Sequence, residues 1–214
     1  MFRDRTDAGK QLANMLQNLK LKDPLVLAIP RGGVVVGYEV AKAFHAKLDI
    51  IVPRKLRAPT EPEVAIGAVI PNAGAFLYES TVSTLGITKE YVEEEKRHQM
   101  REAERMLRTY RDKRPYPQIL NKTVIVADDG VATGATMIVA LRWIKTQKAK
   151  RVIAAIPVAP SEVLALIRQE ADEVVCLNAP ELFYAVGQFY ENFEPVEDNE
   201  VIKILNDYRS ESGQ

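Results

Sequence analysis

The chain has little cysteine, histidine and tryptophan, and it carries no excess of charge. Its 214 residues include one cysteine, two histidines and one tryptophan. One cysteine cannot form an intrachain disulfide or a multi-cysteine zinc module, so the sequence favours a reducing compartment. Lysine and arginine together number 29, as do aspartate and glutamate. Because no overall positive field favours nucleic acid or an anionic membrane surface, we expect neither as a partner.

The sequence also lacks a run of about 18 apolar residues, the length that a membrane-spanning helix requires. Its first residues, Met1 to Arg5, lead into a polar segment without the apolar centre of a secretory leader. We therefore expect a cytoplasmic protein. A hydrophobic content of 47% in a chain of this length suits a single domain over residues 1–214.

Short apolar runs alternate along the chain with segments in which apolar residues recur at helical spacing. Such alternation predicts an α/β fold with a mainly parallel sheet and helices on both faces. Strands are expected at 25–29, 48–52, 123–127, 152–158 and 174–177, and helices at 34–44, 135–147 and 161–171. An amphipathic helix that includes Leu12 and Leu16 comes first, and residues 64–70 and 76–78 are expected to pair as a hairpin.

The segment from 88 to 114 is dominated by charged residues. Opposite charges stand four apart at Glu93 and Arg97 and again at Glu104 and Arg108, and apolar residues form only a narrow stripe. This pattern predicts a long, mostly solvated helix that serves as a surface arm or a dimer contact. Binding of nucleic acid is disfavoured because the acids cancel the bases.

The most informative segment runs from Val124 to Met137. An apolar strand ends there in Asp128 and Asp129, and small and hydroxyl residues then lead into a helix. The backbone N–H groups of such a turn, together with the start of the helix, can bind a phosphate at the carboxyl edge of a parallel sheet. The two carboxylates would repel that phosphate, but they suit the vicinal hydroxyls of a sugar. The pattern therefore predicts a site for a phosphorylated sugar, against the alternative that the acids merely cap the turn.

This segment resembles the phosphoribosyl pyrophosphate (PRPP) motif of type I phosphoribosyltransferases, in which an apolar strand and two acids precede an Ala-Thr-Gly-x-Thr loop. By that resemblance Asp128 and Asp129 would bind the ribose hydroxyls. The residues that would bind the 5-phosphate are Ala132, Thr133, Gly134, Ala135 and Thr136. The implied activity is transfer of ribose 5-phosphate from PRPP to a nitrogenous base, or the reverse pyrophosphorolysis.

Two further segments resemble parts of that family that bind pyrophosphate. Pro30 to Gly33 follows the first core strand and resembles the pyrophosphate loop, which often contains a non-proline cis peptide. Arg54 and Lys55 follow the second strand and resemble a basic pair that contacts the diphosphate, although a solvated charge cluster is the alternative. Residues 57–63 would form a mobile loop that closes over the site. The implied pyrophosphate-binding residues are Arg31, Gly32, Gly33, Arg54 and Lys55, and the implied catalytic residues are Arg31, Arg54, Lys55 and Asp129.

The resemblance also implies the remaining parts of an enzyme. A hood built from the termini would cover the acceptor, with Phe183 and Tyr184 as candidates either to stack on a flat base or to pack onto the core. Mg²⁺ would bind mainly through PRPP and water, so no protein ligand to the metal is assigned. A homo-oligomer is expected, with a dimer favoured. The chain would divide into a core at about 24–178, a helical insertion at about 88–114, and a hood from about 1–20 and 179–214.

The chain departs from the family pattern at two positions of the loop. Ala132 stands where enzymes that act on 6-oxopurines usually have an acid, so the loop is nearer to that of adenine, orotate and uracil enzymes. Gly130 stands where an apolar residue is usual. The charged insertion, together with the segment Pro180 to Gly187, resembles a less characterised branch of phosphoribosyltransferases.

Two other functions are weighed against this one. A regulator that senses PRPP or a nucleotide would keep the binding loop without turnover, but retention of Arg54 and Lys55 argues against it. A dinucleotide-binding oxidoreductase is suggested by Gly32, Gly33 and Gly37, but their spacing is not G-x-G-x-x-G.

Overall fold

The structure, a computed structural model, describes every residue except 63, 72–73, 112–113, 115 and 213–214. Its centre is a five-stranded sheet in the order β2-β1-β6-β7-β8, in which every pairing is parallel. The strands are β1 (Leu25–Ala28), β2 (Lys47–Ile50), β6 (Thr123–Ala127), β7 (Arg151–Val158) and β8 (Glu173–Asn178). Most of their side chains are apolar and buried, as is expected for a sheet that helices cover on both faces. The predicted strands are confirmed, with differences of at most two residues at their ends.

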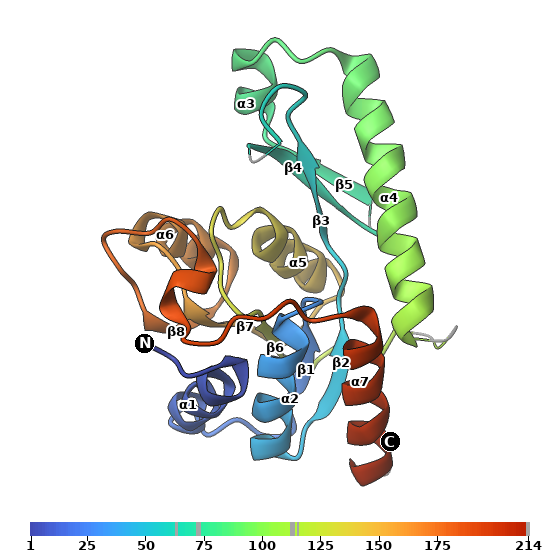
Figure 1. Cartoon of the computed structure of the whole chain (residues 1–214). Helices are drawn as coiled ribbons and strands as arrows, with labels where there is room; N and C mark the ends of the chain where they lie inside the picture. Colours follow the sequence, from blue (N-terminus) through green and yellow to red (C-terminus); the bar gives the residue numbers. More distant parts are fainter. Residues whose placement is uncertain (63, 72–73, 112–113, 115, 213–214) are drawn as a thin grey trace.

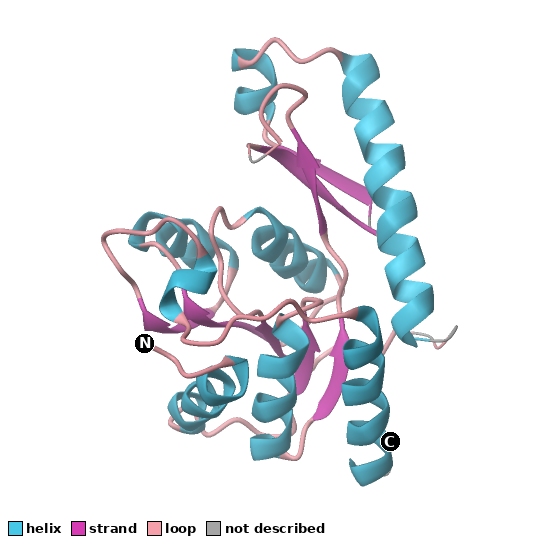
Figure 2. Ribbon diagram, in the orientation of Figure 1, coloured by secondary structure: helices cyan, strands magenta, loops and turns pink. Residues whose placement is uncertain are grey.

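Helices cover both faces of this sheet, as Figures 1 and 2 show. One face carries α1 (Arg5–Gln17), α2 (Gly33–Phe44) and α7 (Asp198–Ser212), and the other carries α5 (Ala135–Thr146) and α6 (Ser161–Glu170). The apolar side chains of the first group form one core cluster, and those of the second group form another. The predicted fold class is therefore confirmed. Among the described residues, no helix is both long and apolar enough to cross a membrane.

A lobe leaves the carboxyl end of β2 and extends away from the main sheet (Figure 1). It contains the antiparallel strands β3 (Arg54–Arg57), β4 (Ala65–Ile70) and β5 (Gly74–Leu77), followed by α3 (Glu79–Thr84) and α4 (Lys89–Arg111). The expected hairpin and the long helix are confirmed. Arg54 and Lys55 follow the second strand as expected, and they are the first two residues of β3.

Some expected segments extend beyond the described residues. Glu63 of the expected closing loop, residues 112–113 of the expected insertion and residues 213–214 of the expected hood lie outside them.

The long helix α4 joins the lobe to the core rather than forming a solvated arm. Val92 packs in the apolar cluster of the lobe, whereas Ala103 and Met106 belong to the cluster of the main sheet. At the end of α4, the buried Arg111 donates two hydrogen bonds to Asp49 of β2, from Nε to Oδ1 at 2.8 Å and from NH2 to Oδ2 at 2.7 Å. The helix is therefore attached along its length, and its buried stripe was wider than the sequence suggested.

The order of the strands fixes the place where a ligand is expected. The chain leaves β1 through α2 toward β2 at one side, and it leaves β6 through α5 toward β7 at the other side. Because β1 and β6 are neighbours, the loops that follow them diverge at the carboxyl edge of the sheet. Open α/β sheets bind ligands at such a switch point. The two loops concerned are residues 29–32 and 128–134.

Candidate functional site

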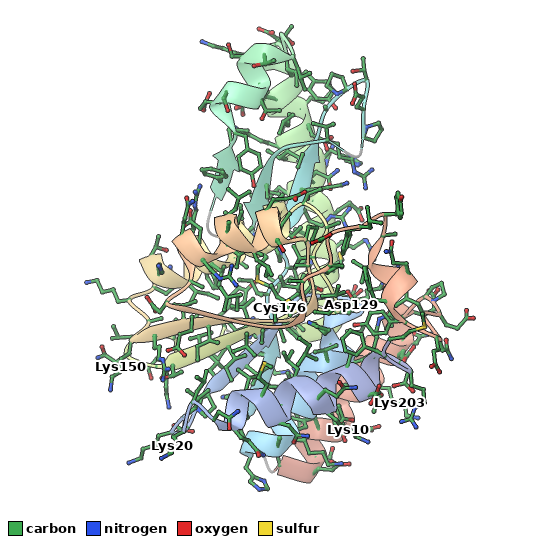
Figure 3. The ribbon with its side chains drawn as sticks, turned by 90° about the vertical axis from the view of Figure 1, so that its left-hand side faces the viewer. Lys10, Lys20, Asp129, Lys150, Cys176 and Lys203 are labelled. Atoms are coloured by element: carbon green, nitrogen blue, oxygen red, sulfur yellow. The ribbon has the colours of Figure 1, made fainter. Side chains whose placement is uncertain are left out.

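Asp128 and Asp129 follow directly after β6, at the switch point of the sheet. The side-chain Oδ1 of Asp128 accepts a hydrogen bond from the backbone N–H of Asp129 at 2.9 Å. Burial raises the pKa of Asp128 well above its ordinary value, and the adjacent Asp129 raises it further. Figure 3 shows Asp129 on the opposite side of the sheet from Lys20 and Lys150, which precede β1 and β7. Two desolvated acids side by side are costly unless a partner compensates them.

Arg5, in the first turn of α1, supplies part of that compensation. Its Nε donates to Oδ2 of Asp129 at 2.6 Å, and its NH1 donates to the carbonyl oxygen of Glu194 at 2.8 Å. Its guanidinium carbon lies 3.7 Å from the centre of the Phe193 ring. Burial raises the pKa of Asp129, while the hydrogen bond and the charge of Arg5 oppose that rise. Sequence reasoning missed Arg5, because nothing local distinguishes it from the neighbouring surface arginine Arg3.

The turn between β1 and α2 lies directly against the two acids. A Cβ atom on Gly32 would lie 1.8 Å from Oδ2 of Asp129 and 2.6 Å from Nε of Arg5. On Gly33 it would lie 2.9 Å from the Cα of Asp128. Larger residues would therefore push the turn away from the carboxylates. The peptide bond between Pro30 and Arg31 is cis, as expected, and α2 begins at Gly33, so the first N–H groups of that helix lie at the same edge.

Residues 132–136 form the turn that leads into α5. Gly134 has a φ of 82°, in the left-handed region that favours glycine, and it caps the helix. Ala135 and Thr136 are the first two residues of α5, where backbone N–H groups have no partner within a helix. Ala132 and Thr133 are exposed. The turn thus offers amide and hydroxyl donors at the positive end of a helix dipole, an arrangement that suits an anion.

The C-terminal segment returns across this edge and pairs with the N-terminus. The Phe2 N–H donates to the carbonyl oxygen of Phe189, and the Glu191 N–H donates to that of Phe2. The buried Tyr190 then donates its hydroxyl to the backbone carbonyl of Asp129 at 2.5 Å. Phe2 and the segment 189–191 are therefore held against the loop that carries the acids.

Gly130 allows this segment to approach the loop. A Cβ atom there would lie 2.3 Å from Cγ1 of Val186 and 3.2 Å from Cγ1 of Val158. The apolar residue that the family usually has at this position would not fit beneath Val186. The departure from the family pattern thus has a packing reason.

The two aromatic residues expected to cover an acceptor lie in different surroundings. Phe183 packs against Phe189, with ring centres 5.4 Å apart, in a cluster that also contains Phe2 and Val158. Tyr184 is 85% exposed. Phe183 therefore has a packing role of its own, and Tyr184 is the more accessible of the two to a ligand.

Arg31 points toward α7 and α4. Its NH1 lies 3.7 Å from a carboxylate oxygen of Glu197 and 3.7 Å from one of Asp198. Asp198 also accepts a hydrogen bond from the hydroxyl of Tyr110 at 2.5 Å and lies 3.7 Å from Arg105. The contacts of Arg31 are long and partly exposed, so they hold the guanidinium weakly.

Arg54 and Lys55 begin β3, four residues after the end of β2. The Nε of Arg54 donates to Oε1 of the buried Gln99 on α4 at 3.1 Å. Burial lowers the pKa of Arg54, and the nearby Arg57 lowers it further. Lys55 is half-buried on the same strand. The structure thus groups the acids and the two glycine-containing turns closely, while it directs the Arg54 side chain onto α4.

Comparison with known sequences agrees with this geometry. The model of the phosphoribosyl transferase domain family matches residues 5–194. A protein of Mycobacterium tuberculosis strain H37Rv, named as a candidate phosphoribosyl transferase, is 39% identical over 206 residues, which cover 96% of this chain and 46% of that protein. A protein of strain CDC 1551 matches to the same extent. The chain therefore spans about half the length of the curated relatives that it matches.

Solved structures show the same architecture. The crystal structure of TT1426 from Thermus thermophilus is similar with a TM-score of 0.84 and 39% sequence identity, covering 97% of this chain and 99% of that chain. The AQ2163 protein from Aquifex aeolicus shares the fold at 16% identity, with a TM-score of 0.52, covering 82% of this chain and 74% of that chain.

Proposed function

Because the chain belongs to the phosphoribosyl transferase domain family, we propose that it transfers ribose 5-phosphate from PRPP to a nitrogenous base. The observation that carries this proposal is the meeting of two acids with the starts of two helices at the switch point of the sheet. Carboxylates accept hydrogen bonds from a sugar diol, whereas helix N-termini bind phosphate. PRPP carries a diol between two phosphate-bearing positions, so its functional groups match this arrangement.

We assign the ribose hydroxyls to Asp128 and Asp129. In the free protein Oδ2 of Asp129 is bonded to Arg5 at 2.6 Å, so a hydroxyl would bind its other oxygen or displace Arg5. Hydroxyl donors favour an ionised carboxylate, whereas burial raises the pKa of Asp128 in the free protein. Binding of PRPP should therefore promote release of a proton from this pair of acids.

We assign the two phosphate-bearing ends of PRPP to the two turns. The 5-phosphate would bind the turn into α5, through Ala132, Thr133, Gly134, Ala135 and Thr136. The diphosphate would bind the turn into α2 and the start of β3, through Arg31, Gly32, Gly33, Arg54 and Lys55. Arg31 would exchange its 3.7 Å contacts with Glu197 and Asp198 for the diphosphate.

In the proposed reaction, the bond between C1′ and the pyrophosphate oxygen breaks, and pyrophosphate leaves with the electron pair. C1′ forms a bond to the acceptor nitrogen, which loses its proton. Because the transition state has oxocarbenium character, negative charge grows on the leaving group, and Arg31, Arg54 and Lys55 would stabilise it. Asp129 would hold the ribose in place beside the reacting carbon.

A Mg²⁺ ion would be held mainly by oxygens of PRPP and by water, and it would neutralise charge on the diphosphate. The donors at this edge fit such a hard cation, because Asp128 and Asp129 present oxygen atoms. In the part of the chain that the structure describes, no three His, Cys, Asp or Glu side chains form a group that could hold a metal ion by itself.

The acceptor would enter beneath the C-terminal segment, with Phe183 and Tyr184 as its aromatic neighbours. Ala132 lacks the acid that 6-oxopurine enzymes usually have, so adenine or a pyrimidine is the expected acceptor. The dimeric state and the cytoplasmic location stay predictions.

The direct test is a pyrophosphate-release assay with PRPP, Mg²⁺ and a panel of adenine, hypoxanthine, guanine, uracil and orotate. We expect release that depends on one of these bases and on the metal ion. Formation of the matching nucleoside monophosphate in equal amount would identify the acceptor. Absence of turnover with every base, in protein that does not bind PRPP, would contradict the proposal.

The same assay separates the enzyme from a PRPP-sensing regulator. A regulator would bind PRPP in calorimetry but would release no pyrophosphate with any base. The contact of Arg5 with Asp129 is the observation that favours this alternative, because it occupies one oxygen of the proposed ribose site.

A further inference from the structure

A pocket of about 310 Å³ lies along β2, the outermost strand of the main sheet, and it shares no residue with the proposed PRPP site. It is lined by the first three residues of β2, the ends of α4 and α7, Arg114 and residues 116–118. This volume is at the small end of the range for ligand sites, which suits a compact ligand. The residues that matter for its chemistry are Lys47, Asp49, Arg111, Arg114, Tyr116 and Arg209.

The lining of this pocket carries an excess of positive charge. Arg111 and Asp49 satisfy one another through two hydrogen bonds, so the excess rests on Lys47, Arg114 and Arg209. Within the described part of the chain, no carboxylate lies within ion-pair distance of any of these three. Like charges so close repel one another unless an anion joins them.

The hydrogen bonds of the two arginines leave most of their donors available. Arg114 donates its Nε to the backbone carbonyl of Arg111 at 3.1 Å, and Arg209 donates NH1 to Oδ1 of Asn206 at 3.4 Å. Burial lowers the pKa of Arg209, and the charge of Arg114 lowers it further. Each guanidinium has five N–H groups, so both can still form the paired hydrogen bonds that a phosphate accepts.

Tyr116 gives a second and independent sign of a ligand. Its ring lies under the guanidinium of Arg111, with the Arg111 carbon 4.3 Å from the ring centre. Its hydroxyl is buried and has no hydrogen-bond partner among the residues that the structure describes. Buried hydroxyl groups almost always have a partner, because leaving one unpaired costs free energy.

We propose that this pocket binds a small ligand through a phosphate or diphosphate group. Arginine forks match the oxygens of phosphate, and a phosphate monoester carries about −1.5 to −2 charges near neutral pH, which suits several unpaired cations better than a single carboxylate does. The site is separate from the proposed PRPP site, since it lies along the outer strand β2 and shares no residue with that site. It does not depend on the proposed transferase activity, because none of its residues belongs to that machinery.

The chain contains its own fluorescence probe close to this pocket. Trp143, its one tryptophan, lies with its ring centre 5.2 Å from that of Tyr116. Titration with inorganic phosphate and with pyrophosphate should change the tryptophan fluorescence, and calorimetry run alongside measures the heat. Succinate serves as a dicarboxylate of similar charge.

The decisive variant is Arg114→Gln combined with Arg209→Gln. Its matched control is Arg108→Gln combined with Lys203→Gln, which removes the same charge from exposed positions of α4 and α7. We expect the wild type and the control to bind pyrophosphate alike, and the decisive variant to bind it at least tenfold more weakly in the fluorescence titration. Circular dichroism checks folding, and the single substitutions replace the pair if the double variant is unstable.

Three results would overturn the proposal. One is a decisive variant that titrates like the wild type. Another is succinate binding as tightly as the phosphates, which would remove the assignment to phosphate. The third is the absence of a fluorescence change in the wild type, together with a heat of binding that is the same in the wild type and in the decisive variant.

Discussion

Two aspartate–arginine pairs stand at different places on the same sheet, and they differ in how completely they are satisfied. On the outer strand β2, Arg111 bonds both oxygens of Asp49 in a buried fork. At the carboxyl edge, Arg5 bonds one oxygen of Asp129 at 2.6 Å, beside a second acid. The first pair is complete within the protein, whereas the second leaves carboxylate oxygens without a matching cation.

The comparison shows that a ligand is indicated by charge that the protein's own side chains leave unbalanced, and not by the presence of an ion pair. The acids at the carboxyl edge leave negative charge, which suits hydroxyl donors such as a ribose diol. The cations around the Asp49 pair leave positive charge, which suits a phosphate. The two proposed sites therefore have opposite charge preferences, and substitutions at each should have different consequences.

The largest effect should come from neutralising both acids at the carboxyl edge. Asp128→Asn combined with Asp129→Asn removes the charged acceptors for the ribose hydroxyls, and hydrogen bonds to charged groups contribute about 1.5–3 kcal/mol each. We therefore expect PRPP affinity, measured by calorimetry with Mg²⁺, to fall by about 10²- to 10⁴-fold. The fold should persist, since the change removes buried charge.

Asp207→Asn combined with Glu211→Gln is the matched control, because it removes two exposed acids from α7. This control should bind PRPP like the wild type. Unchanged affinity in the variant that lacks both Asp128 and Asp129 charges would remove the ribose assignment.

The Asp49–Arg111 pair should instead show its effect in stability. Arg111→Met leaves Asp49 buried without its cation, and breaking one side of a buried ion pair costs about 3–5 kcal/mol. Urea unfolding followed by circular dichroism should show this loss. Adding Asp49→Asn should restore most of it, because the remaining charge is then removed as well.

Arg108→Met is the control on the exposed side of α4, and it should change stability little. A cost for Arg111→Met no larger than that of Arg108→Met would mean that the fork does not hold α4 to the sheet.

The carboxyl edge should also make stability depend on pH. Burial raises the pKa of Asp128 above its ordinary value of 3.8, so above that pH the folded state holds more protons than the unfolded state. The unfolding free energy of the free protein should therefore fall as pH rises through this window, by about 1.4 kcal/mol for each tenfold change in the acid dissociation constant. Asp128→Asn removes this contribution to the pH dependence of the unfolding free energy.

Urea unfolding at pH values from 4.5 to 7.5 tests this prediction. The Asp128→Asn variant should be more stable than the wild type at pH 7, and the difference should shrink toward acid pH. Parallel curves for the two proteins would show that the carboxyl is not desolvated in the folded state.

The parallel sheet and its acid-bearing turn could be predicted from the sequence because each is encoded locally. The strands are apolar runs between turn residues, and Asp128 and Asp129 follow one of them directly. The strand β3 gave no such signal, because only Leu56 of its four residues is buried. The helix α7 did have a local signal in the sequence, since Val201, Leu205 and Tyr208 are buried at helical spacing.

The contacts that form the two aspartate–arginine pairs join segments far apart in the sequence. Arg5 and Asp129 are separated by 124 positions, and Arg111 and Asp49 by 62. No pattern near Arg5 distinguishes a guanidinium that reaches a ligand site from one on the surface, because only the folded chain brings its partner near. The two acids at the carboxyl edge were thus predictable, whereas the residue that balances them was not.

The smallest effect should follow from Tyr190→Phe, which removes one hydrogen bond from the carboxyl edge. Its hydroxyl donates to the carbonyl of Asp129 at 2.5 Å, and such a bond contributes about 0.5–1.5 kcal/mol. Unfolding stability should fall by that amount, and PRPP affinity should fall by less than tenfold, because the carboxylates stay in place. Tyr184→Phe is the matched control, since Tyr184 is 85% exposed. Equal losses in the two variants would mean that the Tyr190 hydroxyl does not position the acid-bearing loop.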